Sequence, residues 1–473
     1  MRIDLAPGEL HNLVRRRGGL EVRPGLVSVA EPTAGREFVA CQTVESPFTQ
    51  EVWHYLLERS TSTGEATVRV VTEEFVDLFS AYAGVVPREV SMTLGVAGGQ
   101  MVLNSPDFSF PLYGLPGGGL IRSEKRESIN PDSTALEVPT GHVCSFGDRL
   151  PVAQRNVVLF NDPGPEPRTY TAQNALGLTG EVHDMFQAGD GSLYMFTSTG
   201  VFYMPQDALG KGQIVEGFVG FIPGIETFRA RNAAASGNIV ACLSKDGIVI
   251  IGRGGKPITM STYHAPRRLS RAVEVDDFRI NGRLFGVPTG FVIALPTRGV
   301  MIDIDLRNGH RSYVWHQSED LDVVGVLRSR EGETMFLTPN RALVSVGNFD
   351  WGASRPLGVA AVETLLPEGQ TPMVRFVTVG SDGVGDSVQV ATEGVLPSPK
   401  TVPGRSEDTR IGSDLWSSVK RWGGRRSRSV RFGIAKRTDQ VSVEVAVESG
   451  LRTVSPDATV DIVGQGRSRR SRR

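Results

Sequence analysis

Cysteine is scarce in this chain of 473 residues, which contains only Cys41, Cys144 and Cys242. The number is odd and no two have CxxC spacing, which argues against a disulfide framework and a thiolate zinc site. Long apolar runs are also missing, since the longest, 284–296, is too short to span a bilayer and is broken by glycine and proline. The N-terminus has no apolar segment behind a basic start, so no secretory signal is visible. We expect synthesis in a reducing cytoplasm and no membrane segment.

Familiar catalytic motifs are missing as well. The sequence has no GxSxG elbow, and its seven histidines include no HExxH pair. The segment GRGGKP (252–257) has the wrong glycine spacing for a phosphate loop, and 303–309 has an arginine where a calcium ligand is needed. The acidic pairs at 73–74 and 276–277 are adjacent in sequence, so on a strand their side chains point to opposite faces. We therefore expect no catalytic residue, no cofactor and no metal: the protein is predicted not to be an enzyme.

Net charge is nearly absent, at −1, but it is unevenly distributed. Residues 405–473 hold 16 Lys/Arg against 8 Asp/Glu, mostly in the clusters 420–437 and 467–473. Such clusters are typical of solvated interaction tails. The predicted interaction residues are Arg425, Arg426, Arg428, Arg431, Arg469, Arg470, Arg472 and Arg473.

The basic residues have two candidate partners, DNA phosphates and carboxylates of neighbouring subunits. Residues two apart on a strand share a face, so Arg426 and Arg428 are expected to project together as a pair able to meet carboxylates. Phosphate contacts would weaken steeply with salt.

Glycine is abundant, at 55 residues, and it marks a repeat. Five units of apolar strands joined by tight turns follow one another, at 143–160, 184–204, 230–252, 276–305 and 323–347. Their first turns lie near Gly147, Asp190, Gly237, Gly282 and Gly332, so the period is 43 to 50 residues. Valine-rich, isoleucine-rich and aromatic strands with NG, DG and TG turns indicate hairpins, and several strands per 40 to 50 residues indicate β-propeller blades.

The predicted fold is therefore all-β, a six-bladed β-propeller, because stacking twisted meanders in a ring covers both their faces and their edges. The sixth blade is expected from GREFVACQTV (35–44) or from the hairpin 373–392. Irregular hairpins of a β-sandwich remain the alternative.

The flanking regions do not share the period. Residues 46–60 are predicted to form a short helix, and strands are predicted within 66–115; a polar, glycine-rich loop is expected at 116–134. Alternating strands at 429–436 and 440–449 indicate a half-buried antiparallel sheet. The predicted domains are an N-terminal segment with an accessory or platform domain (1–140), the propeller (141–370), and a C-terminal β domain with a basic tail (371–473).

Three stretches of the sequence carry a family resemblance. They are GELHNLVRRRGGLEVRPGLV (8–27), the long stretch from FGDRLPVAQRNVVLFNDPG to GSLYMFTSTGVFYM (146–204), and GRRSRSVRFGIAKR (424–437). In this order they resemble the tail nozzle proteins of short-tailed bacteriophages, also called tail tubular protein B or packaged-DNA stabilisation proteins. Each motif alone is weak, and the order and combination supply the specificity. Residues 45–140 do not match the family.

The resemblance implies a structural virion protein located in the viral tail. Six copies would form a homohexamer attached to the adaptor or portal complex of the head-to-tail connection. Tail fibre or spike proteins are further implied partners, and genomic DNA would be retained in the lumen and conducted through it at ejection. Tight phosphate binding would obstruct such a conduit, so we favour subunit contacts over phosphate contacts for the basic residues of 405–473. Two rivals stay open: a glycan-binding or hydrolytic propeller, and a cellular propeller scaffold that binds peptides.

Overall fold

The computed structural model describes most of residues 25–347 and isolated strands on either side. Continuous description covers 25–45, 51–97, 100–105, 140–161, 170–208, 219–244, 247–251, 280–295, 300–306 and 321–347. Elsewhere it describes only the strands β1–β4, β12, β13, β25, β29 and β33–β39. All regular elements described are strands apart from one 3₁₀ turn, η1 (Gln206–Ala208).

Seven units of four antiparallel strands follow one another along the chain. Blades 1 and 2 contain β6 (Arg36–Glu45), β7 (Val52–Ser60), β8 (Glu65–Thr72), β9 (Asp77–Val85), β10 (Thr93–Ala97), β11 (Gln100–Asn104), β12 (Ser109–Tyr113) and β13 (Ile121–Arg122). Blades 3 and 4 contain β14 (His142–Val143), β15 (Val152–Gln154), β16 (Val157–Asn161), β17 (Tyr170–Gly177), β18 (Val182–Gln187), β19 (Leu193–Thr197), β20 (Gly200–Met204) and β21 (Gly220–Pro223).

The remaining blades complete the ring. Blades 5 and 6 contain β22 (Ala233–Ser236), β23 (Ile239–Ser244), β24 (Gly247–Ile251), β25 (Pro257–Met260), β26 (Arg283–Val287), β27 (Gly290–Leu295), β28 (Val300–Asp305) and β29 (Ser312–Gln317). Blade 7 contains β30 (Gly325–Arg328), β31 (Thr334–Thr338) and β32 (Arg341–Gly347), and its outermost strand is β5 (Gly25–Ala30) from the other end of the chain.

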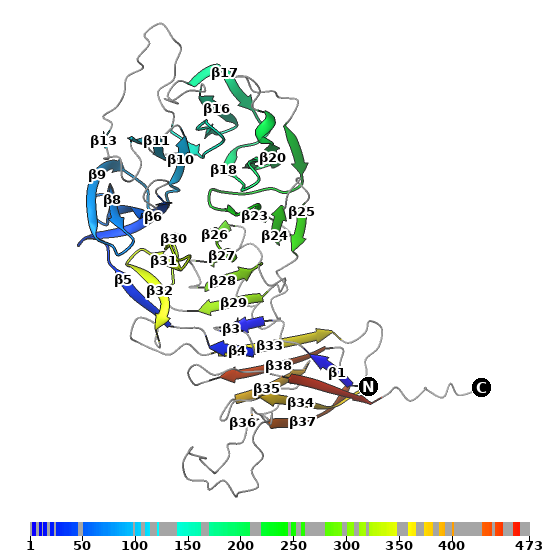
Figure 1. Cartoon of the computed structure of the whole chain (residues 1–473). Coiled ribbons are helices and arrows are strands. Elements are labelled where there is room, and N and C mark those ends of the chain that lie inside the picture. Colours follow the sequence, from blue (N-terminus) through cyan, green and yellow to red (C-terminus); the bar gives the residue numbers. More distant parts are fainter. Residues whose placement is uncertain are drawn as a thin grey trace, which may run out of the picture.

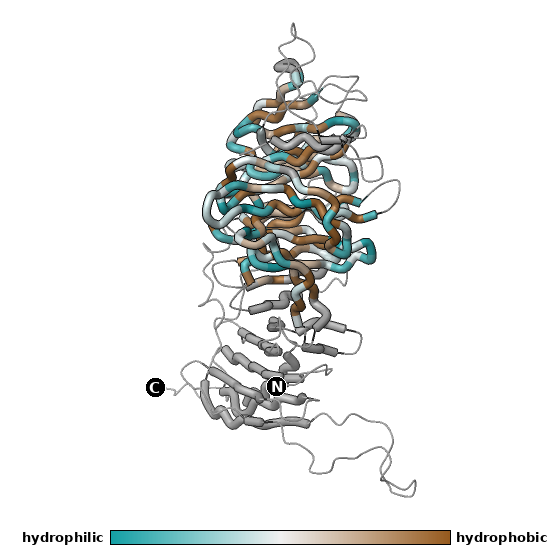
Figure 2. Tube along the Cα trace, turned by 90° about the vertical axis from the view of Figure 1, so that its left-hand side faces the viewer, coloured by the Kyte–Doolittle hydropathy of each residue, from teal (hydrophilic) through white to brown (hydrophobic). Residues whose placement is uncertain are grey.

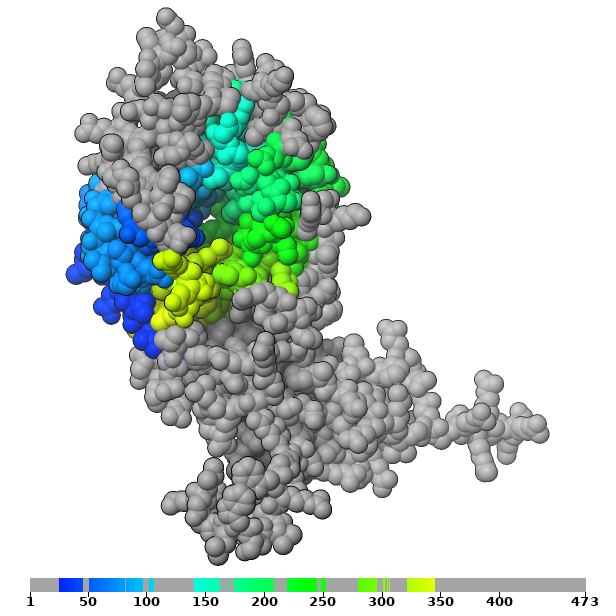
Figure 3. All heavy atoms as spheres, in the orientation of Figure 1, coloured from blue at the N-terminus to red at the C-terminus, as the bar shows by residue number. Residues whose placement is uncertain are grey.

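Blade 7 is where the two ends of the repeat meet. β5 pairs antiparallel with β32, and the chain then passes directly into β6, the first strand of blade 1. The first strands of successive blades face the axis, and Figure 3 shows the described atoms arranged around a central hollow. This composite blade closes the ring, because opening it would require β5 to leave its partner strand.

Packing between neighbouring blades explains the repeat of apolar strands in the sequence. The middle strand of a blade is covered on both faces, so β23 is buried at every position but its first, and its side chains alternate between two neighbours. Val240 and Cys242 pack toward blade 4, whereas Ala241 and Leu243 pack toward blade 6. Apolar clusters of this kind occupy all seven interfaces between neighbouring blades. Figure 2 shows the hydrophobic stretches running through the interior of the ring, with hydrophilic turns around them.

The all-β propeller prediction is confirmed, and the five predicted repeats correspond to blades 3 to 7. The blade number differs, because the ring described here has seven blades where six were expected. GREFVACQTV (35–44) does belong to the ring, as part of β6. The segment 373–392 does not form a hairpin, because its two strands lie in different sheets outside the ring.

The helix predicted at 46–60 is wrong where the structure describes it, because Val52–Ser60 is strand β7. This strand is a middle strand of blade 1, and the blades on both sides bury its side chains. Burial on both faces produced the dense apolar pattern that was interpreted as a helix. The strands predicted within 66–115 are present as β8 and β10–β12, and most of the loop predicted at 116–134 lies outside the described residues.

Strands from both chain ends build a second β part next to blade 6 (Figure 1). One sheet has the order β1 (Arg2–Leu5), β39 (Asp457–Val463), β34 (Met373–Ser381), β37 (Arg428–Arg437). The other continues the blade 6 sheet: β29 pairs in parallel with β2 (Glu9–His11), followed by β33 (Gly358–Leu365), β38 (Gln440–Val447), β35 (Ser387–Thr392) and β36 (Lys400–Thr401). A hairpin of β3 (Leu13–Arg16) and β4 (Gly19–Val22) connects this part to β5.

Sheet membership therefore does not follow the predicted division of the chain. Strands within 25–122 belong to blades 1, 2 and 7, whereas β1 and β2 pair with C-terminal strands. The predicted strands at 429–436 and 440–449 exist as β37 and β38 but lie in different sheets. The reason is that a ring closed by its own N-terminal strand recruits residues far apart in sequence. The domain limits at 140 and 370 themselves stay predictions.

Candidate functional site: an axial cup in the propeller

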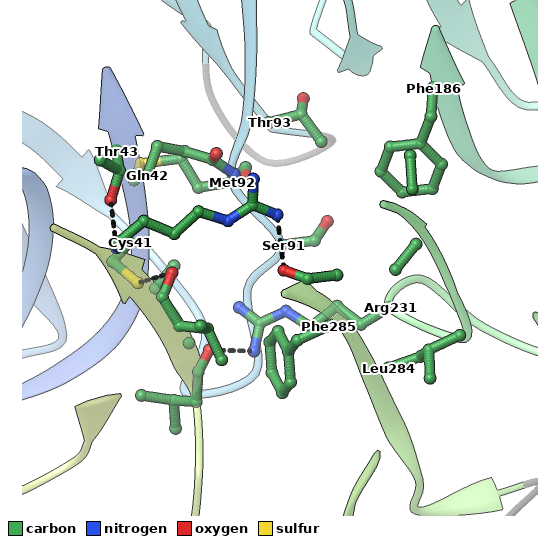
Figure 4. A pocket seen from close by; sticks show the side chains of 18 of the residues that line it. Cys41, Gln42, Thr43, Ser91, Met92, Thr93, Phe186, Arg231, Leu284 and Phe285 are labelled. Carbon is green, nitrogen blue, oxygen red and sulfur yellow. Dashed lines mark hydrogen bonds between the residues drawn. The ribbon is translucent and has the colours of Figure 1, made fainter. Parts of the chain in front are cut away.

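The first strands of the blades enclose a cavity of about 480 Å³ on the propeller axis. Its walls come from β6, β18, β22, β26 and β30 and from the segment leading into β10. Figure 4 shows Cys41, Gln42 and Thr43 on one side of this cavity and Phe186 and Leu284 on the other. Because these strands begin at one end of the axis and finish at the other, the cavity has two distinct ends. We call it the axial cup.

The floor of the axial cup is Arg231, which lies two residues before β22. Its guanidinium donates from Nη1 to the carbonyl oxygen of Val324 at 3.2 Å, and from Nη2 to the carbonyl oxygens of Val39 at 3.1 Å and of Val90. These acceptors lie at the start of β30, within β6 and just before β10, so one side chain from blade 5 spans the axis to three other blades. The axis is therefore closed at the end where the inner strands begin.

The backbone at Arg231 is in an unusual conformation that a carboxylate holds in place. Its φ is 70°, in the left-handed region that non-glycine residues rarely adopt. Its N–H donates to Asp184 Oδ1 at 2.9 Å, and the N–H of Ala233 donates to Asp184 Oδ2 at 3.0 Å. Burial raises the pKa of Asp184 to about 7, against the opposing effect of these donors and of the Arg231 charge. Burial, reinforced by the nearby charge of Arg283, lowers the pKa of Arg231 to about 9, which leaves it a cation at neutral pH.

Further cations surround the floor, and these have carboxylate partners. Arg283, whose side chain is 6% exposed, donates to Asp322 Oδ1 at 3.2 Å and to the carbonyl oxygen of Val323 at 3.1 Å. Arg229 pairs with Glu89 at 2.9 Å. Arg231 differs from both because every hydrogen bond of its guanidinium in the described structure goes to a main-chain carbonyl. No carboxylate accepts a hydrogen bond from its guanidinium among the described contacts, although the charge of Asp184 lies close enough to favour the cation.

The cavity is narrow because the inner strands around it approach each other closely at small residues. A Cβ atom at Gly286 would overlap the carbonyl oxygen of Ala235, and one at Gly325 would overlap Cys41 Sγ. The Cys41 thiol donates to the carbonyl oxygen of Val326 at 3.7 Å, and burial raises its pKa to about 12. It therefore stays a neutral thiol at physiological pH and is no nucleophile.

The open end of the axial cup carries a second cation. Arg328, the last residue of β30, donates from Nη2 to the carbonyl oxygen of Gly286 at 2.7 Å, and its main-chain N–H donates to Thr43 Oγ1 at 3.3 Å. Burial lowers its pKa, although the residue as a whole is exposed. Phe186 and Phe285 line the same cavity and are partly exposed. The lining thus combines a guanidinium with aromatic surface.

This arrangement is suited to binding. Two guanidiniums, one at each end of a blind cavity, create a positive potential that low-dielectric walls concentrate. The oxygens of Asp184 are both engaged with backbone donors, and the Cys41 thiol is neutral. Within the described residues, no three His, Cys, Asp or Glu side chains are grouped closely enough to hold a metal ion. Nor does that part of the chain contain a helix long and apolar enough to cross a membrane.

The structure describes two of the interaction residues predicted from the sequence, and neither lines the axial cup. Arg428 and Arg431 are in β37, opposite Ser381 and Thr378 of β34. Arg425, Arg426, Arg469, Arg470, Arg472 and Arg473 lie outside the described residues. The sequence analysis missed Arg231, Asp184 and Arg328. They occupy different positions in their blades, since Arg231 precedes β22, Asp184 lies within β18 and Arg328 ends β30, so aligning the repeats would not have grouped them.

Comparisons with known proteins assign this chain to no family. No family model matches the chain, and no curated protein matches it. Among solved structures, it is similar to the WD40 β-propeller domain of Doa1, with 12% identity over 67% of this chain and 97% of that one and a TM-score of 0.40. It is also similar to PorZ of the type IX secretion system of Porphyromonas gingivalis, with 13% identity over 72% of this chain and 43% of that one and a TM-score of 0.40.

A gluconolactonase from Xanthomonas campestris is a third similar structure, with 9% identity over 73% of this chain and 99% of that one and a TM-score of 0.33. The propeller is assigned from the strand pairing described above, and ligands and partners of these proteins are not carried over.

Proposed function

We propose that this chain is a structural subunit of the tail nozzle of a short-tailed bacteriophage, a virion component and not an enzyme. Six copies would form a ring on the adaptor or portal complex, with genomic DNA in the central lumen and tail fibres or spikes as further partners. The observation that carries the proposal is the ordered occurrence of three family-like motifs at 8–27, 146–204 and 424–437.

The middle motif has a physical basis in blade 3. Arg149 of its GDRL segment is 1% exposed and donates to the carbonyl oxygen of Asn161 at 3.0 Å. The Asn161 side chain accepts the N–H of Leu150 at 2.6 Å, and the Tyr170 hydroxyl donates to the carbonyl oxygen of Leu150 at 2.7 Å. The GDRL and FNDPG segments are thus linked by one buried network. Because one network joins them, we treat the GDRL and FNDPG segments as one structural signature.

The first terminal motif lies where the propeller meets the second β part. The motif at 8–27 supplies β2, which joins blade 6 to the second part, and the start of β5, which closes blade 7. The motif at 424–437 contains β37, an edge strand of the second part. The resemblance therefore covers one junction of the chain and one edge of the second β part.

The closed propeller axis bears on where DNA would pass. Because Arg231 spans the axis, a conduit through a single propeller is not available in this conformation. A lumen would have to lie between copies, as a nozzle ring requires. The asymmetric distribution of charge, +8 on 405–473 against −9 on 1–404, suits such an assembly because unlike surfaces of neighbouring copies meet in a cyclic ring.

Mass measurement tests the proposal directly. The full-length chain is measured alone and after addition of a purified adaptor ring from the phage that encodes it. We expect six copies per ring, and a monomer or weak oligomer without the ring, because weak lateral contacts need a template. A chain that stays monomeric with the adaptor and is absent from purified tails would contradict the proposal.

The basic strand offers a second test. Arg426→Ala combined with Arg428→Ala is expected to weaken nozzle assembly while the propeller stays folded. If the double variant assembles normally but filled particles lose DNA in a salt-sensitive way, these arginines contact phosphates instead.

A ligand-binding propeller, either a glycan-binding or hydrolytic protein or a peptide-binding scaffold, is the second candidate. The axial cup, a blind cavity of about 480 Å³, favours it. A purified chain that stays monomeric and binds a glycan or peptide, with no affinity for an adaptor ring, would favour this candidate.

A further inference from the structure

The charges of the axial cup are incompletely balanced. In the described part of the chain, the guanidiniums of Arg231 and Arg328 hydrogen-bond only to main-chain carbonyls, whereas the neighbouring Arg229 and Arg283 have carboxylate partners. Carbonyl oxygens satisfy the donors but leave the positive charge, and the potential of two such cations in one cavity favours a bound anion.

The carboxylates that line the axial cup balance these charges only in part. The charge of Asp184 favours the cation at Arg231, but both Asp184 oxygens accept main-chain N–H groups, and no hydrogen bond among the described contacts joins Asp184 to either guanidinium. Glu45 lines the cavity as an exposed residue and forms no ion pair with Arg328 among the described contacts.

The mouth also offers surface for a group attached to the anion. Phe186 and Phe285 line the same cavity as Arg328 and are partly exposed, and Ser91 adds a hydroxyl group to the lining. Figure 4 shows Phe285 near Arg231, Phe186 at the upper right, and Ser91 near the centre of the view. A volume of about 480 Å³ exceeds what a lone carboxylate needs and fits a side chain with its neighbours.

We infer that the axial cup binds an extended acidic peptide of a protein partner, with one carboxylate against Arg328 at the mouth and adjacent apolar side chains against Phe186 and Phe285. A guanidinium can hold a carboxylate through two parallel N–H donors, and Arg328 retains such donors beyond the bond to Gly286. Arg231 adds a longer-range attraction from the floor. This inference does not depend on the tail-nozzle proposal.

The probe is a library of N-acetylated, C-amidated hexapeptides with one fixed glutamate and randomised neighbours, together with its glutamine counterpart. Both peptide libraries are passed over the full-length protein, and the peptide that binds most tightly is titrated by calorimetry. We expect glutamate peptides with apolar neighbours to be retained, and replacement of the glutamate by glutamine to weaken binding at least tenfold, the loss expected for a charge-assisted pair.

The variants locate the site. Arg328→Gln is expected to weaken binding at least tenfold, and Arg328→Lys to lie between it and the natural chain, because lysine keeps the charge without the two-pronged donor geometry. Arg155→Gln, at an exposed arginine in the turn before β16, is the matched control and leaves binding unchanged. Circular dichroism and melting curves check that each variant is folded, and Arg328→Lys carries the test if Arg328→Gln is not.

Three results would overturn the inference. They are equal binding of the glutamine library, no retention of any peptide at millimolar concentration, and an affinity that is unchanged in Arg328→Lys and Arg328→Gln. Free succinate is titrated in parallel. If succinate binds as tightly as the best peptide, the partner is a small carboxylic acid and the peptide assignment is wrong.

Discussion

Replacing Arg231 by methionine should destabilise the whole ring, because this one side chain connects four blades. Methionine keeps an unbranched stem of similar length but removes the donors to the carbonyl oxygens of Val39, Val90 and Val324. It also leaves Asp184 without its nearby cation. Hydrogen bonds from a charged donor contribute roughly 1.5 to 3 kcal/mol each, and removing one partner of a buried charge pair costs about 3 to 5 kcal/mol. We expect a loss of about 3 to 5 kcal/mol in the free energy of unfolding.

The matched control is Arg155→Met. Arg155 has a φ of 50°, close to the 70° of Arg231, so both substitutions place methionine on a left-handed backbone. Its side chain is exposed, and no described hydrogen bond or ion pair involves its guanidinium. The comparison therefore isolates what the Arg231 guanidinium contributes across the axis. Arg231→Lys should recover little, because an ammonium group cannot reach three carbonyls in a planar arrangement.

Urea denaturation followed by circular dichroism gives the midpoint and slope for each variant, and native-state hydrogen exchange shows where protection is lost. The exchange measurement is needed because a chain with a propeller and a second β part does not have to unfold in one step. We expect protection to fall in β6, β22 and β30 together. If Arg231→Met is no less stable than Arg155→Met, the assignment of Arg231 as the residue that holds the floor together is refuted.

Three further changes test other features of the ring. Gly286→Ala should cost about 1 to 3 kcal/mol in thermal or urea unfolding, because its Cβ would meet a neighbouring main-chain carbonyl, whereas Gly177→Ala, with open space around it, should be neutral or stabilising by up to ~1 kcal/mol; equal effects would contradict the close packing. Burial lowers the pKa of His142 to about 4, so the unfolded chain takes up its proton near pH 6.5 and the folded chain only near pH 4. The stabilisation is present above pH 6.5 and is lost as the pH falls toward 4. His142→Leu should therefore reduce the drop in unfolding free energy between pH 7 and 4.5 by about 2 to 3 kcal/mol, and an unchanged drop would show that His142 is not the titrating group. Deleting residues 1–30 removes β5 and should abolish hydrogen-exchange protection in β32, whereas deleting 1–5 should leave that protection intact; retained protection after the longer deletion would mean that β5 does not close the ring.

The sequence predicts the blades whose middle strands are uninterrupted and whose turns are short. Strands such as β23 and β27 are buried on both faces, so they appear as continuous apolar runs between glycine turns. Gly237, with a φ of 57°, is one turn that glycine makes possible. Blade 1 escaped detection because β6 to β9 are longer strands, and because the pattern of β7 also fits a helix. The local sequence pattern of β7 cannot distinguish a strand from a helix. Packing against the blades on either side makes it a strand.

The axial cup could not be predicted in the same way. Arg231 acts through three main-chain carbonyls, and any residue type supplies a carbonyl, so its partners leave no mark in the sequence. Its conformation depends on Asp184, which lies 47 residues earlier in the neighbouring blade. The basic clusters near the C-terminus are the opposite case. The composition alone reveals them, but it does not say which groups they contact.

Ring closure explains why composition and spacing reveal the fold class but not the division of the chain. A propeller without an interlocked blade would hold its first and last blades together by side-chain packing alone, and either edge strand could open. Pairing β5 with β32 makes the last blade depend on residues more than 300 positions earlier. The same logic extends outward, because β2 lies between β29 and β33 and so connects blade 6 to the C-terminal strands. The first 30 residues thus hold together parts that are distant in sequence. A force or a partner acting on this N-terminal segment would therefore reach the ring and the second β part at once.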